Sequence, residues 1–112
     1  MRRDELVLYT VAEFWAAARA HELASHLKTD AASRLQAAGV AFTEMGAPHV
    51  AGTLRHALHR IRESSGSRKQ VREIVRDLES ELIETDDPVE LLLAALAARY
   101  ISGAGYARGA GN

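Results

Sequence analysis

Residues 55–76, RHALHRIRESSGSRKQVREIVR, contain the apolar spacing that decides the fold. In and beside this stretch, apolar residues recur at steps of three or four: Leu54, Leu58 and Ile61 before the turn, and Val71, Ile74 and Leu78 after it. Such steps place side chains on one side of an α-helix. The serines and glycine of residues 64–67 are typical of a turn. The stretch therefore predicts two amphipathic helices that meet at a short connection.

The same helical period runs through the rest of the chain, and no segment alternates for long with the two-residue period of a strand. We expect five helices, over residues 4–27, 30–45 and 48–63, and from residues 67 and 88 onward. Ser67 and Gln70 have the spacing of a capping box, and Asp87 is suited to cap the fifth helix. Residues 89–101, VELLLAALAARYI, are apolar on almost every side. We therefore expect the fifth helix to be the central and most buried one.

The length and composition predict one domain. A chain of 112 residues is long enough to bury a core without disulfides or metals. Glycine-rich residues follow Ser102 at the C-terminus, and such composition is typical of flexible segments. We expect an all-α domain, a compact bundle of about five helices in residues 1–102, with a flexible tail in residues 103–112.

Several protein classes are excluded by what the sequence lacks. There is no cysteine, so a disulfide framework and a zinc ribbon are impossible, and a reducing cytoplasm is the location we expect. No run reaches the roughly 18 apolar residues of a membrane span, and early acidic residues argue against a secretory signal. No catalytic motif such as HExxH, GxSxG or a P-loop occurs. We expect no enzymatic activity and no cofactor.

Histidine spacing raises the question of a metal site. His56, His59 and Glu63 lie three and four residues apart, which is a spacing that could hold a cation on one helix face. Basic neighbours surround them and would repel a cation. We therefore expect no bound metal.

The charged residues are sorted along the chain, although the net charge is only −1 at pH 7. Residues 55–72 contain six Arg or Lys, two His and one acid, whereas residues 73–90 contain eight acids and one Arg. In the fourth helix this order opposes the helix dipole, which favours acids at the N-terminus and bases at the C-terminus. A local sequence preference that is violated often marks a functional site. An anion bound at the N-terminus of this helix would compensate the unfavourable basic charges there.

Basic side chains of the third and fourth helices form the candidate site for that anion. Their helical spacing places them away from the apolar stripes. Cations and free backbone N–H groups at a helix start, as after residue 67, bind phosphate without reading bases. The candidate nucleic-acid-binding residues are Arg55, His59, Arg60, Arg62, Arg68, Lys69 and Arg72. Two other interpretations stay open: an ordinary solvated face with pairs such as Lys69–Glu73, and contact with an acidic protein surface, including that of another copy.

One local stretch, residues 53–66, resembles the recognition helix of GntR-type winged-helix regulators. The positions that match are Thr53, Leu54, Arg55, Ala57, Leu58 and Ile61. This resemblance implies a helix-turn-helix regulator that binds duplex DNA. Those regulators continue into a two-stranded wing, whereas this sequence predicts another helix.

The whole chain is similar in size, helix content and basic edge to the small all-helical subunits of multi-subunit CRISPR effector complexes. The resemblance implies a non-catalytic subunit of a ribonucleoprotein that holds the backbone of RNA or single-stranded DNA. Its partners would be other protein subunits and further copies of itself, with no membrane involved. The alternatives are a helical protein–protein adaptor or antitoxin-like module, and the helix-turn-helix regulator. The sequence does not separate RNA from DNA.

Overall fold

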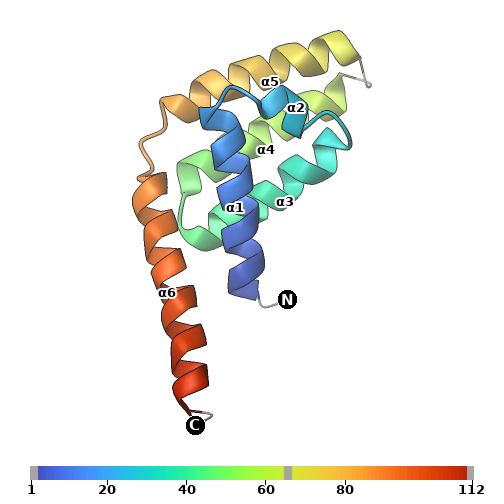
Figure 1. Cartoon of the computed structure of the whole chain (residues 1–112). Helices are drawn as coiled ribbons and strands as arrows, with labels where there is room; N and C mark the ends of the chain where they lie inside the picture. The colour runs from blue at the N-terminus through green and yellow to red at the C-terminus, as the bar shows by residue number, and fades with distance from the viewer. Residues whose placement is uncertain (1–2, 65–66, 111–112) are drawn as a thin grey trace.

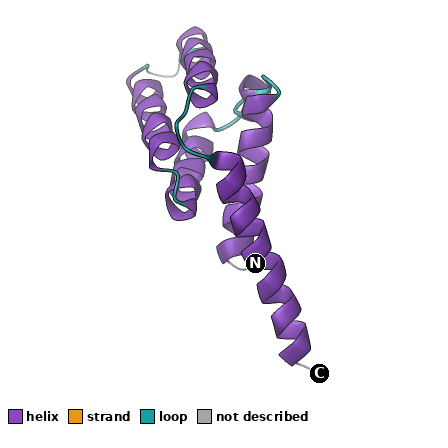
Figure 2. Ribbon diagram, turned by 90° about the vertical axis from the view of Figure 1, so that its left-hand side faces the viewer, coloured by secondary structure: helices purple, strands orange, loops and turns teal. Residues whose placement is uncertain are grey.

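The computed structural model describes residues 3–64 and 67–110, and side chains for residues 3, 5–64 and 67–101. Within these ranges the chain is all helical, with no strand (Figures 1 and 2). The six helices described are α1 (Arg3–Arg19), α2 (Leu23–His26), α3 (Ala31–Met45), α4 (Pro48–Glu63), α5 (Arg68–Ile83) and α6 (Val89–Ala110). The predicted all-α class is confirmed, and the third expected helix has the bounds of α4.

The helices α3, α4 and α5 follow one another as antiparallel neighbours, with α4 between the other two (Figure 1). α1 packs across α3 and α5, and the short α2 lies against α5. α6 starts beside α1 and then extends beyond the other helices (Figures 1 and 2). The chain therefore measures 56 Å along its longest axis, against 26 and 21 Å across.

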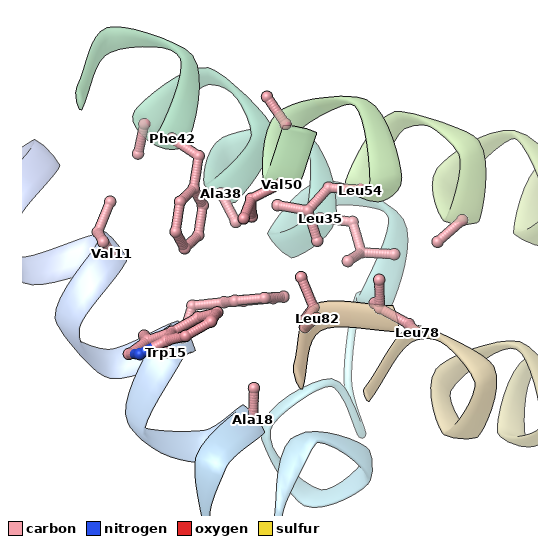
Figure 3. Packing of buried hydrophobic residues seen from close by; sticks show 14 of the residues in the cluster. Val11, Trp15, Ala18, Leu35, Ala38, Phe42, Val50, Leu54, Leu78 and Leu82 are labelled. Atoms are coloured by element: carbon pink, nitrogen blue, oxygen red, sulfur yellow. The ribbon is translucent and has the colours of Figure 1, made fainter. Parts of the chain in front are cut away.

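Three aromatic rings hold α1 and α3 together. Phe14 and Trp15 both contact Phe42 edge to face, with ring centroids 5.9 and 6.4 Å apart, which is a favourable geometry for aromatic pairs. All three are buried, although Phe14 and Trp15 are neighbours in sequence. Aliphatic residues of α3, α4 and α5 complete this core (Figure 3).

The first expected helix, over residues 4–27, is wrong as a single element. α1 ends at Arg19, and His21 adopts the left-handed conformation with φ of 58°. The chain turns there, and α2 then brings Leu23 and Leu27 into the core. No glycine or proline marks this break, so local sequence carries no signal for it.

Two of the expected helix ends are confirmed, and a third has a different role. Gly46 ends α3 with φ of 95°, and Ser67 caps α5 by accepting a hydrogen bond from the Gln70 N–H. Asp87, expected to cap the last helix, instead accepts a hydrogen bond from the Val50 N–H at 2.8 Å. Asp87 therefore provides an acceptor for a backbone N–H in the first turn of α4. Ala47, at the N-cap position of this helix, has no polar side chain that could accept such a hydrogen bond.

The expectation that the last helix is the central one is wrong. Among the described side chains of α6, Val89 and Leu96 are buried, whereas Leu91 is 73% and Ile101 67% exposed. A helix that is apolar all round has no contrast between its faces to direct its packing. The helix that contacts α2, α3, α5 and α6 is instead α1. None of the helices in the described ranges is long and apolar enough to cross a membrane.

The expected tail overlaps the end of α6. The backbone of residues 103–110 is helical, while residues 111–112 and the side chains after residue 101 lie outside the description. The flexibility of residues 103–112 stays a prediction.

Candidate nucleic-acid interface

Three of the candidate residues line one hollow between α3 and α4, which we call the α3–α4 groove. It has a volume of about 570 Å³. Arg55, His59 and Arg62 share one flank of α4 because they are four and three residues apart. The other described lining residues are Leu35, Gln36, Gly39, Val40, Thr43, Glu44 and Leu58. The groove therefore has an apolar floor and a basic wall.

Carboxylates reduce the charge of this wall only in part. Glu44, the one acid among the described lining residues, forms an ion pair with Arg3. His59 faces Glu63 one turn further along α4, with 2.5 Å between Nε2 and Oε1. Arg55 and Arg62 have no carboxylate partner among the side chains that the structure describes. These two arginines are therefore the available cations of the groove.

Arg60 lies on the opposite flank of α4. Its Nη1 donates a hydrogen bond to Asp77 Oδ2 of α5 at 3.3 Å. Because α4 is packed between α3 and α5, residues on its two flanks point toward different neighbours. Arg60 therefore joins α4 to α5 and does not line the α3–α4 groove.

A second hollow, of about 510 Å³, holds two further candidates. Arg68 and Arg72 project from α5 toward α2 and the connection to α3, where Lys28 joins them. The rest of its described lining is Ala24, Leu27, Thr29, Ala31, Val71 and Val75, without an acid. Lys28 is not among the residues expected from the sequence, because its position here depends on the turn at His21.

A third hollow, of about 360 Å³, continues the second one. The two share Ala24, Arg72 and Val75, and the third adds the charged or titratable side chains Arg76, Glu79 and His21, with Ser80 and Ile83. We call the two together the α2–α5 furrow. Glu79 Oε2 lies 3.4 Å from His21 Nδ1, so one end of the furrow carries a paired acid. Arg76 was also missed, although it continues the four-residue spacing of Arg68 and Arg72.

The expected single basic edge is thus divided. The α3–α4 groove and the α2–α5 furrow have no described lining residue in common, and the exposed Lys69 lines neither. Two serines of the turn form hydrogen bonds with the ends of the adjoining helices. Ser64 Oγ donates to Ile61 O at the end of α4, at 2.6 Å, and Ser67 Oγ accepts from Gln70 N at the start of α5. Ser65 lies outside the described residues.

The described part of the chain has no cluster of three or more His, Asp or Glu side chains suited to a metal ion. Fold and surface define a small helical protein with a basic groove, a basic furrow and an apolar last helix that is partly exposed. No protein-family model, curated protein or solved structure matches the chain. Both sequence resemblances therefore stay predictions.

Proposed function

We propose that this protein binds nucleic acid without catalysis, through the phosphate backbone. The observation that carries the proposal is the set of cations that line the groove and the furrow and have no carboxylate partner in the ranges described. They are Arg55 and Arg62 in the α3–α4 groove, and Lys28, Arg68, Arg72 and Arg76 in the α2–α5 furrow. Guanidinium and ammonium groups that line a hollow suit a chain of phosphates, whose binding releases counterions.

The distribution of ion pairs favours this function over an ordinary solvated face. Eight acids follow in residues 73–90, yet between α4 and α5 the described side chains form a single ion pair, Arg60–Asp77. The other cations that line the groove and the furrow therefore form no direct ion pair with these acids in the ranges described. A bound polyanion would compensate their charge.

We place this binding protein within a larger ribonucleoprotein, as a small subunit of the CRISPR-effector type. The exposed apolar surface of α6 supports a role in an assembly, because such surfaces commonly mark protein contacts. Size and helix content are the other points in favour. Partners would be the neighbouring subunits, and the nucleic acid would be RNA or single-stranded DNA.

A helical adaptor is the second candidate, and α6 favours it. Leu91, Ala94, Ala98 and Ile101 are exposed and recur at steps of three, four and three, as in a helix–helix seam. The helix-turn-helix regulator is less favoured, since α5 follows α4 where a wing would lie. The double substitution Leu91→Glu with Ile101→Glu would abolish partner binding by an adaptor and leave oligonucleotide affinity unchanged.

Fluorescence anisotropy with labelled single-stranded and duplex oligonucleotides, at rising salt, tests the main proposal. We expect the affinity to fall steeply with salt, and Arg68→Ala/Lys69→Ala/Arg72→Ala to reduce the slope of log affinity against log salt by about 2. The matched control, Arg19→Ala/Arg34→Ala/Arg99→Ala, removes the same charge outside the groove and the furrow and should keep the slope. Absence of binding at low salt, or an equal effect of the control, would contradict backbone binding at these residues.

A further inference from the structure

The α2–α5 furrow combines a row of cations with an apolar wall, which backbone binding alone does not require. We propose that it binds single-stranded nucleic acid, with one unstacked base against the apolar wall and the adjoining phosphates on Arg68, Arg72 and Arg76. This inference rests on the proposed function and adds the position of a base and a preference for single strands over duplexes.

The cation row follows from helix geometry. Residues 68, 72 and 76 are four apart, so they share one side of α5 at intervals of about 6 Å along the helix axis. Arg68 and Arg72 line the larger hollow, and Arg72 and Arg76 the smaller one. Lys28 faces the first pair from the connection before α3. Successive phosphates of one strand could therefore meet successive guanidinium groups.

The larger hollow has the size and lining of a base site. Its volume of about 510 Å³ lies within the roughly 300–1,000 Å³ of small-molecule pockets. Ala24, Ala31 and Val71 provide accessible aliphatic surface for the flat face of a base. The buried Leu27 and Val75 lie beneath this surface, and Arg72 offers a guanidinium plane on which a base can stack. A bare phosphate would gain nothing from the aliphatic wall, whereas a nucleotide uses both parts.

A duplex cannot use this wall. Its bases are stacked on both faces and paired along their edges, so a base must leave the stack before it can enter a pocket, at a cost of about a few kcal/mol. The unstacked bases of a single strand avoid this cost. The furrow should therefore favour single strands over duplexes of equal length.

The acid at the far end limits the length of the binding track. Glu79, which is paired with His21, follows Arg76 on the same side of α5. Between Arg68 and Glu79 the helix rises about 16 Å. The carboxylate of Glu79 would repel a further phosphate, so the furrow accommodates only a short segment of a strand.

The test compares a short oligothymidylate with an abasic oligonucleotide of the same length and charge, by anisotropy on the full chain. The native protein should bind oligothymidylate up to about tenfold more tightly, because stacking of a base on an aromatic side chain is worth about 1–3 kcal/mol and contact with an aliphatic wall corresponds to the lower end of that range. Ala24→Leu/Ala31→Leu fills the larger hollow and keeps every cation. It should reduce oligothymidylate affinity to the abasic level and leave abasic binding unchanged. The control, Ala12→Leu/Ala37→Leu on exposed positions of α1 and α3, should leave both affinities unchanged.

Three results would overturn the inference. Equal affinity for the two oligonucleotides would show that no base is bound, even though backbone binding stands. If Ala24→Leu/Ala31→Leu still bound oligothymidylate more tightly than the abasic oligonucleotide by the same factor as the native protein, the base would bind outside the larger hollow. Equal binding of oligoglutamate, used as an acidic peptide of the same charge, would show that the furrow recognises polyanions without regard to bases. Binding of neither oligonucleotide would overturn the proposed function as well, and this result is distinct from the other three.

Discussion

α5 and α6 are consecutive helices with opposite compositions and opposite outcomes. α5 is rich in charge, yet Ile74, Val75, Leu78 and Leu82 are all buried. α6 is almost free of charge up to Arg99, yet large side chains such as Leu91 remain exposed. Contrast between the faces of a helix therefore determines which side is buried, whereas a high apolar content alone determines neither the direction nor the depth of burial.

The largest expected effect tests this contrast directly. Leu78 of α5 is 1% exposed, so Leu78→Ala should lower the free energy of unfolding by about 3 kcal/mol through lost burial and a cavity. Leu91→Ala in α6 removes the same atoms from an exposed position and should change it by less than about 0.5 kcal/mol. Urea denaturation of both variants gives the comparison. A similar loss in Leu91→Ala would place α6 in the core.

The connection between the two helices gives a smaller effect. Asp87 accepts the Val50 N–H hydrogen bond, so Asp87→Ala should destabilise the protein by about 1 kcal/mol, as the loss of a helix cap does. The exposed neighbour Asp86 is the matched control. Asp86→Ala should change the free energy of unfolding by less than about 0.5 kcal/mol. Thermal and urea unfolding measure both. Equal losses would mean that Asp87 acts through charge near α6 and not as the cap of α4.

The smallest expected effect concerns the charged surface of α5. Arg60 and Asp77 have side chains that are 38% and 56% exposed, so water and salt screen their attraction. A double-mutant cycle with Arg60→Ala and Asp77→Ala should give a coupling energy of about 0.5 kcal/mol, which decreases at high salt. A coupling of several kcal/mol, insensitive to salt, would show that α5 depends on this pair as much as on its apolar face.

The exposed cations show how far sequence reasoning reaches into the candidate site. The flank positions of Arg55 and Arg62 follow from their spacing relative to Leu54 and Leu58, because the helix period relates them. The ion pair of Arg60 could not be predicted in this way, since its partner lies on another helix. Lys28 joined the site only through the packing of α2 against α5, whereas the position of Arg76 follows from its spacing to Arg68 and Arg72.

Local sequence was enough for the all-α class, for the bounds of α4, for the cap at Ser67 and for the buried faces of α4 and α5. These features depend on residues within one or two helical turns of each other. The break at His21, the use of Asp87 by α4, the division of the basic residues and the exposed position of α6 depended on tertiary contacts. Each of them arises where residues far apart in sequence compete for the same place in the core or complete each other's hydrogen bonds, and no short stretch contains both partners.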